Sequence, residues 1–198
     1  VGIGAVVDLA AYFFTVLAVL LFHVLVIYNL MLKGLTGLSP RILMDKMRPV
    51  WAFAFSTASS GATLPVTLHT VEHRLGVHNS VASFAIPLGA TVNMDGTAIM
   101  QGVATVFIAQ VYGVDLSMTA YVTIIITATL ASIGTAAVPG AGLITLAMVL
   151  AQVGLPVEGI ALIIGVDRLL DMVRTAVNVT GDVVVSVIVA QSEKQLDE

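Results

Sequence analysis

Five strongly polar residues near the carboxyl end of this sequence are spaced as if they lay on one face of a helix. Steps of four, three, four and four residues separate Asp167, Asp171, Arg174, Asn178 and Asp182, and such steps keep side chains on one side of an α-helix. The planar guanidinium of Arg174 suits a carboxylate, Asp171 suits an ammonium group, and Asn178 can donate to a second carboxylate. Aspartate and glutamate carry these three groups. The alternative is a ladder of structural ion pairs that faces another helix.

Two carboxylates, Asp95 and Asp182, have no obvious basic partner in the sequence. A buried carboxylate without a partner is costly, and a bound cation would offset that cost. Residues 93–97 are rich in groups that break helices, so main-chain carbonyls there could act as ligands. Ligands that are all oxygen atoms suit a hard ion such as sodium. The alternative is that Asp95 is protonated or is capped by neighbouring hydroxyl groups.

The composition predicts that these residues are held by membrane-embedded elements. Hydrophobic residues make up 58% of the chain, charged residues only 10%, and the mean hydropathy is +1.04, whereas soluble domains carry about 25% charged residues. So few charges cannot cover a water-exposed surface, which leaves the lipid bilayer as the expected surroundings.

The net charge of −4 and the lack of a basic stripe argue against nucleic-acid binding. Without cysteine, disulfides and thiolate metal sites are excluded.

Uncharged runs of two lengths divide the chain. Residues 9–32 are long enough for one complete span, expected over 5–33, in which His23 and Asn29 are interpreted as helix-packing groups. A helix over residues 49–58 would be only about 15 Å long, half the thickness of a membrane. The stretch that follows, residues 59–65, consists mostly of small and polar residues. A re-entrant hairpin is therefore expected over 41–76. Residues 116–157 are uncharged around a similar stretch at 134–142, which predicts a second re-entrant hairpin over 116–154.

A span follows each predicted hairpin. The first, over 78–113, is broken at residues 93–97, and the second, over 156–191, carries the five polar residues. Hairpin and span thus occur twice, the pattern typical of transporters with inverted repeats. The predicted fold is an all-α integral membrane protein with two re-entrant helical hairpins.

If the first span enters the cytoplasm at its carboxyl end, six cations are cytoplasmic: Lys33, Arg41, Lys46, Arg48, Arg74 and Lys194.

Four motifs of this sequence resemble those of the dicarboxylate/amino acid:cation symporter family, and they occur along the chain in the same order as in that family. They lie at residues 59–65, 87–97, 134–142 and 167–182. This family includes glutamate transporters and archaeal aspartate transporters. The resemblance covers roughly residues 5–190. It implies that 1–198 is the carboxyl-terminal transport core of a longer, multi-pass protein of the plasma or cell inner membrane. It also implies sodium-coupled symport by alternating access, no enzymatic activity, no organic cofactor, and a homotrimer formed through an amino-terminal scaffold absent here.

The resemblance implies site residues position by position. Substrate would be held by Ser60, Thr97, Val138, Gly142, Asp171, Arg174, Thr175 and Asn178. One sodium site would use the carbonyls of Gly89, Asn93 and Asn178 with the Asp182 carboxylate. A second would use the carbonyls of Thr91, Ser132, Ile133 and Thr135. A third would use the side chains of Asn93 and Asp95 together with residues of an earlier span.

Two positions depart from the family pattern. Gly61 stands where a serine is common, which is expected to loosen the first hairpin tip. Arg168 is an additional cation that either reaches toward this tip or pairs with Asp171.

Three other functions compete with sodium-coupled symport. Within the same family, a proton-coupled glutamate or C4-dicarboxylate symporter is the alternative. An ion channel could also use hairpin carbonyls, but a bare arginine in its path would repel cations. An intramembrane hydrolase would pair Ser59 or Ser60 with His69 or His73, although His73 lies too far along the helix for hydrogen-bond reach.

Overall fold

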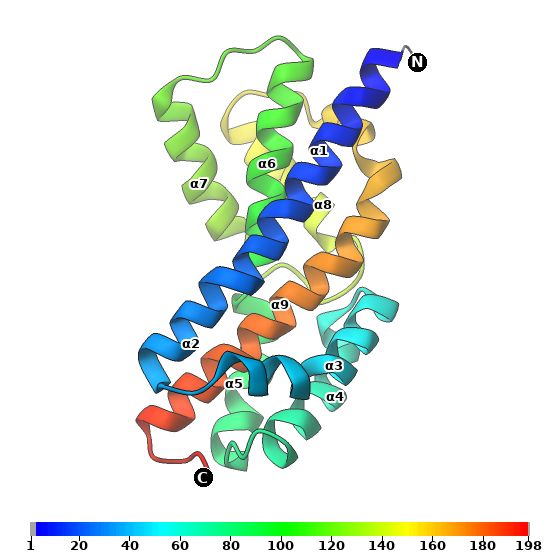
Figure 1. Cartoon of the computed structure of the whole chain (residues 1–198). Helices are drawn as coiled ribbons and strands as arrows, with labels where there is room; N and C mark the ends of the chain where they lie inside the picture. Colours follow the sequence, from blue (N-terminus) through cyan, green and yellow to red (C-terminus); the bar gives the residue numbers. More distant parts are fainter. Residues whose placement is uncertain (1–2, 198) are drawn as a thin grey trace.

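The computed structural model describes residues 3–197, which are helical with short connecting loops and contain no β-strand. Figure 1 shows the arrangement, and the all-helical prediction is confirmed for these residues. The elements are α1 (Ile3–Phe22), the π-helical segment η1 (His23–Tyr28), α2 (Asn29–Thr36), α3 (Pro40–Thr57), α4 (Ser60–His73), α5 (Asn79–Val92), α6 (Asp95–Val111), α7 (Met118–Ser132), α8 (Ala141–Gln152), the 3-10 helix η2 (Val157–Leu162) and α9 (Ile164–Ser192).

Two helical runs are long and apolar enough to cross a membrane. The first joins α1, η1 and α2 over Gly4–Thr36, and the second is α9; their most apolar windows have mean hydropathies of 2.5 and 1.5. The first run ends at Gly37, whose φ of 73° is left-handed and whose N–H donates to the Lys33 carbonyl. A bilayer core needs about 20 apolar residues of helix, and both runs satisfy that length.

Two pairs of shorter helices lie within the ranges predicted for the hairpins. α3 packs against α4, and α7 packs against α8. In the first pair, α3 ends at Ala58 in a left-handed conformation, and the Ser59 hydroxyl caps α4 by accepting from the Ala62 N–H at 3.1 Å. In the second pair, the non-helical residues 133–140 join the two arms, and Gly140, with φ of 77°, precedes α8. We call residues 58–61 the first tip and residues 133–140 the second tip.

The helical segment between the two helix pairs is interrupted within residues 93–97, where the sequence predicted a break. α5 ends at Val92 and α6 begins at Asp95, because Asn93 and Met94 have non-helical backbone angles. The break frees the amides of the first turn of α6 for other partners, since these have no carbonyl acceptor within their own helix. Both halves pack against α9, so the break faces the polar residues of that helix.

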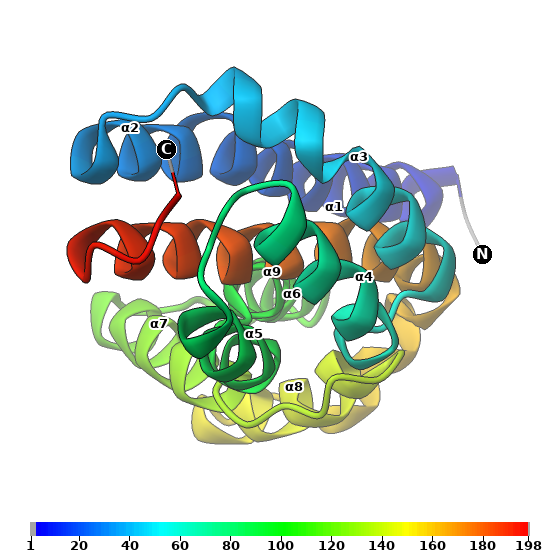
Figure 2. The same cartoon turned by 90° about the horizontal axis from the view of Figure 1, so that it is seen from below.

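Helix α9 lies at the centre of the molecule. It packs against α1 through α6, and Figure 2 shows it between α1 on one side and α5 and α6 on the other. Apolar residues such as Leu170, Val177 and Val184 are buried along it. The five polar residues noted in the sequence are buried as well, so the polar face of α9 points into protein.

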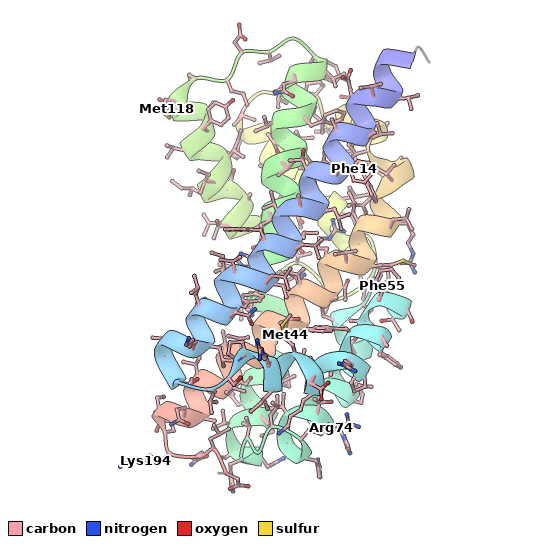
Figure 3. All side chains as sticks on the ribbon, in the orientation of Figure 1. Phe14, Met44, Phe55, Arg74, Met118 and Lys194 are labelled. Carbon is pink, nitrogen blue, oxygen red and sulfur yellow. The ribbon has the colours of Figure 1, made fainter. Side chains whose placement is uncertain are left out.

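The outer surface carries many large apolar side chains. Phe14, Phe55 and Met118 are exposed by 64%, 47% and 79%, and Figure 3 shows them on the outside of the molecule. Contiguous apolar surface of this kind belongs against lipid or another protein segment rather than water. This surface agrees with the low fraction of charged residues.

Candidate functional site

The two hairpin tips touch each other. The Gly61 N–H donates to the Ala137 carbonyl at 3.0 Å, and the Ser59 hydroxyl donates to the same oxygen at 2.7 Å. A Cβ atom built on Gly61 would lie 3.0 Å from that oxygen, a closer approach than side chains normally tolerate. The sequence predicted that Gly61 loosens the first tip; in the structure the missing side chain allows the two tips to close.

A small cavity of about 20 Å³ lies beneath the touching tips. A water molecule needs roughly 10–15 Å³ of such space, so the cavity could hold water but not an amino acid. The structure brings together all eight residues predicted to bind substrate along its wall: Ser60, Thr97, Val138, Gly142, Asp171, Arg174, Thr175 and Asn178. An amino acid could therefore enter only after the tips separate.

Arg174 forms two buried ion pairs within α9. Its Nη1 lies 3.1 Å from Asp167 Oδ1, its Nη2 lies 2.8 Å from Asp171 Oδ1, and its side chain is only 2% exposed. Offsets of seven and three residues put both carboxylates on the face of Arg174. Asp167 is not among the residues predicted to bind substrate, although the sequence placed it on the same polar face.

Asp171 also binds the second tip. Its Oδ2 accepts from the Gly140 N–H at 2.8 Å, at the start of α8. The free N–H groups and the positive dipole end at the start of α8 suit an anion, and here that anion is the protein's own carboxylate. Arg168 is exposed on α9, and Asp171 pairs with Arg174 instead. The suggested pairing of Arg168 with Asp171 is therefore wrong.

Asn178 joins α9 to the first turn of α6. Its Oδ1 accepts from the Gly96 N–H at 2.8 Å, and its Nδ2 donates to Thr97 Oγ1 at 3.2 Å. A Cβ atom on Gly96 would lie 2.9 Å from that Oδ1, so glycine allows the helices to approach. The break before α6 thus supplies a free amide to a residue of the cavity wall.

Part of the first predicted sodium site surrounds Asp182. This carboxylate is 2% exposed, and Asn93 Nδ2 donates to its Oδ1 at 3.1 Å. A Cβ atom on Gly89 would lie 2.6 Å from the same oxygen, so the Gly89 backbone lies directly against it. Among residues 3–197 no Lys, Arg or His forms an ion pair with Asp182. A bound cation would offset the cost of burying a carboxylate without a basic partner.

The second predicted sodium site lies between the break and the second tip. The Thr91 carbonyl accepts from the Gly134 N–H at 2.8 Å, and the Ser132 carbonyl accepts from the Thr135 N–H at 3.2 Å. Ile133, between them, has an extended backbone. These contacts join the end of α5 to the second tip. An ion bound by the Thr91 and Ser132 carbonyls would use the second lone pair of each oxygen or replace these hydrogen bonds.

The third predicted sodium site differs most from expectation. Asp95 Oδ2 lies 3.1 Å from His23 Nε2 and accepts from the Tyr28 hydroxyl at 3.0 Å. The sequence indicated no basic partner for Asp95, and this was wrong because His23 lies 72 residues earlier. His23 was interpreted only as a packing group, yet it contacts a predicted ion ligand. Asn93 does not share these partners, because its amide faces Asp182.

Sequence reasoning missed Gln101. This residue is fully buried on α6, and its Nε2 donates to the Gly142 carbonyl at 3.2 Å and to Thr145 Oγ1 at 2.7 Å. It therefore ties α6 to α8 just behind the cavity. One signal could have found it, since Gln101 follows Thr97 by four residues in a predicted span and so shares its helix face.

Comparison with known proteins identifies the family. The model described as the sodium:dicarboxylate symporter family matches residues 1–192. An excitatory amino acid transporter of Caenorhabditis elegans is 50% identical over 174 residues, which are 88% of this chain and 35% of the relative. Excitatory amino acid transporter 2 of Mus musculus is 46% identical over 175 residues, 88% of this chain and 31% of the relative. This chain spans about a third of the length of these relatives. The resemblance found in the motifs is confirmed, and the chain belongs to the sodium:dicarboxylate symporter family.

Proposed function

We propose that this chain is the substrate- and ion-binding core of a sodium-coupled symporter for acidic amino acids. One observation carries the proposal: a fully buried arginine lies in the wall of a cavity that two touching hairpin tips cover. The family description names sodium and dicarboxylates, and the similar relatives are named excitatory amino acid transporters. These are names of transporters, in line with a function that is not enzymatic.

The ion pairs suggest how substrate would bind. A buried guanidinium needs an anion beside it, and Asp167 and Asp171 both pair with Arg174 in this structure. A substrate carboxylate could replace Asp171 at Arg174, because a guanidinium can donate two parallel hydrogen bonds to the two oxygens of one carboxylate. Asp171 would then face the substrate ammonium group, while Asp167 would stay paired with Arg174. Separation of the tips would open the cavity, and their closure would enclose the substrate.

The same proposal covers the membrane arrangement. α1 to α2 and α9 would cross the bilayer, α5 and α6 would form the broken span, and the helix pairs α3–α4 and α7–α8 would be re-entrant hairpins of an inverted repeat. Residues 1–198 would form the transport core. The remaining two thirds of the relatives' length would correspond to the scaffold of a homotrimer in the plasma or cell inner membrane. The break before α6 supports this arrangement, since irregular backbone at membrane depth must be buried in protein.

The hydrolase alternative has little support from the geometry. The Ser59 hydroxyl donates to the Ala137 carbonyl, and His69 and His73 are exposed near the far end of α4. Within residues 3–197 neither serine has a histidine as a hydrogen-bond partner. A general base must lie within hydrogen-bond reach of its nucleophile.

Counterflow of labelled aspartate tests the proposal. The full-length protein would be reconstituted in liposomes loaded with unlabelled aspartate, with and without sodium on both sides. We expect label to accumulate only with sodium, and a sodium gradient to drive net uptake. Exchange that saturates supports a carrier. Flux that rises linearly with aspartate, or exchange that ignores sodium, would contradict the proposal.

One contact favours a second function. His23 lies 3.1 Å from Asp95, and an imidazole beside a carboxylate can take up a proton where a cation would otherwise bind. This favours a proton-coupled symporter for glutamate or C4-dicarboxylates. The same liposomes distinguish the two, because a pH gradient at constant sodium would then drive uptake and a sodium gradient at constant pH would not.

A further inference from the structure

Two histidines on α4 lie outside the substrate and sodium sites. Residues 69–73 read His-Thr-Val-Glu-His, so His69 and His73 are four residues apart in the last turns of α4 and share one face. Both are exposed, their ring centroids are 4.6 Å apart, and their ring planes differ by 16°. The proposed transport mechanism does not use either of them.

A hydrogen bond orients the second imidazole. His73 Nδ1 lies 3.3 Å from the His69 carbonyl oxygen. Because a carbonyl oxygen only accepts, Nδ1 must carry the hydrogen atom, and Nε2 of the neutral ring keeps its lone pair. Metal-binding histidines are commonly oriented in this way, by an Nδ1–H bond to a backbone carbonyl.

We propose that His69 and His73 form a two-histidine site for a late first-row divalent metal ion such as Zn²⁺ or Cu²⁺. Imidazole suits these metals, and two histidines at this spacing are a known zinc-binding arrangement on helices. The two rings are stacked here, so both must rotate about their side-chain torsions before one nitrogen of each points at the same metal ion, with bonds of about 2.0–2.1 Å. This inference does not depend on the proposed transport function.

The surroundings indicate a binding site without hydrolytic chemistry. The order His-x-x-Glu-His also occurs in zinc peptidases, but Glu72 here accepts from Asn79 Nδ2 at 2.6 Å. In the described part of the chain no cluster of three His, Cys, Asp or Glu side chains suitable for a metal is found. Water would therefore complete the coordination shell.

The pair lies at an end of the molecule that is rich in cations. His73 ends α4 beside Arg74, and Figure 3 shows Arg74 and Lys194 at the same end. The positive-inside rule assigns this end to the cytoplasm, where the metal would reach the pair from water. A metal ion bound to both imidazoles would hold together the last turns of α4.

Copper binding to the full-length protein in detergent tests the inference, with one equivalent of Cu²⁺ as the probe. We expect an electron paramagnetic resonance spectrum with coupling from two imidazole nitrogens. His69→Gln and His73→Gln should each remove one nitrogen and weaken Cu²⁺ binding by roughly 10-fold or more. His78→Gln is the matched control, because His78 is also exposed but hydrogen-bonds to Ser80, and it should change neither result.

A second measurement keeps the test independent of copper. Zn²⁺ should raise the melting temperature of the wild type and of His78→Gln, and this increase should be absent in both α4 variants. Elution as a single peak in size exclusion checks that each variant is folded. A spectrum unchanged by either α4 substitution, or a Zn²⁺ effect lost only in His78→Gln, would overturn the site.

Discussion

At the scale of single residues, the two carboxylates that pair with Arg174 have different surroundings. Asp171 lines the cavity and also accepts from the second tip, whereas Asp167 does not line it. An unpaired buried charge costs several kcal/mol, so Arg174 must keep at least one anion through the proposed transport cycle. Asp167 can fill that role continuously. Asp171 can exchange its place with a ligand that enters the cavity.

Replacing Arg174 by threonine tests its role toward the substrate side chain. We expect Arg174→Thr to weaken aspartate binding by roughly 100-fold or more, since hydrogen bonds to charged groups contribute about 1.5–3 kcal/mol each. Serine or another neutral amino acid could then gain affinity. Calorimetric titration with aspartate and serine measures both. Because this change also leaves Asp167 and Asp171 unpaired, Asp167→Asn serves as the control, and it should reduce aspartate affinity far less.

Comparison of aspartate with succinate tests Asp171. Succinate has the two carboxylates but no ammonium group, so Asp171 would face it without a partner. We expect succinate to bind roughly 100-fold more weakly than aspartate, because sites that bind a polar group reject analogues lacking it. Competition against labelled aspartate measures the ratio, and Asp171→Asn should bring it close to one. Equal affinities in the wild type would show that Asp171 has another role.

Residue spacing predicted some of these contacts and not others. The polar face of α9 followed from the helical period alone, because Asp167, Asp171 and Arg174 belong to one continuous helix. The contact between His23 and Asp95 did not, because 72 residues separate them and only tertiary packing brings them together. Local periodicity carries information about one helix but not about which helix lies against it.

At the scale of elements, glycines set how closely the broken span approaches α9. Cβ atoms on Gly89 and Gly96 would lie within 3 Å of Asp182 and Asn178, and one on Gly181 would lie 2.7 Å from Asn93 Nδ2. These close approaches occur around the break in the span. Side chains there would push α5 and α6 away from α9 and would separate the oxygen groups that the predicted sodium site needs.

Gly89→Ala tests whether this approach matters for sodium. The added methyl group would displace the Asp182 carboxylate, since its Cβ would lie 2.6 Å from Oδ1. We expect the sodium concentration for half-maximal aspartate binding to rise by roughly 10-fold or more, comparable to losses at disturbed metal sites. Gly102→Ala on α6 is the matched control, because nothing lies within 4 Å of its Cβ. Equal sodium dependence in both variants would exclude Asp182 as a ligand.

The positions of the helices were largely predictable, but their irregularities were not. Uncharged runs and the small residues at 59–65 and 134–142 indicated where helices begin and end, because apolar length and helix-breaking residues act locally. No such local feature of the sequence predicted the π-helical segment at His23–Tyr28. This segment coincides with the tertiary contacts of His23 and Tyr28 with Asp95, which the local sequence does not indicate.

At the scale of the whole molecule, the second tip is held from three sides. It contacts the first tip through Ala137, α9 through Gly140, and the end of α5 through Gly134. Each contact is one or two hydrogen bonds, which contribute about 0.5–1.5 kcal/mol per bond, or about 1.5–3 kcal/mol for the bond to the Asp171 carboxylate. A ligand that replaces or adds a few such contacts can therefore shift the balance between open and closed tips.

We predict that sodium and aspartate together close the second tip. A sodium ion among the carbonyls of Thr91, Ser132 and Thr135 would draw together dipoles that otherwise repel, and substrate would add contacts at Val138 and Gly142. Because both ligands favour the closed state, each must raise the affinity of the other by the same factor.

Spin labels on the full-length protein test this closure. A label at Ile144→Cys on α8 would move with the second hairpin, and one at Leu169→Cys on α9 would stay fixed; both positions are exposed, and the chain has no cysteine of its own. Distances between the labels should be broadly distributed without ligands and narrow with sodium plus aspartate, while aspartate affinity rises steeply with sodium. Asp182→Asn should reduce both effects, since it removes a charge from a neighbouring ion site. If aspartate affinity depended on pH and not on sodium, the proton would be the coupling ion. Closure would then depend on a group that binds a proton, such as the His23–Asp95 pair, rather than on carbonyls that a cation draws together.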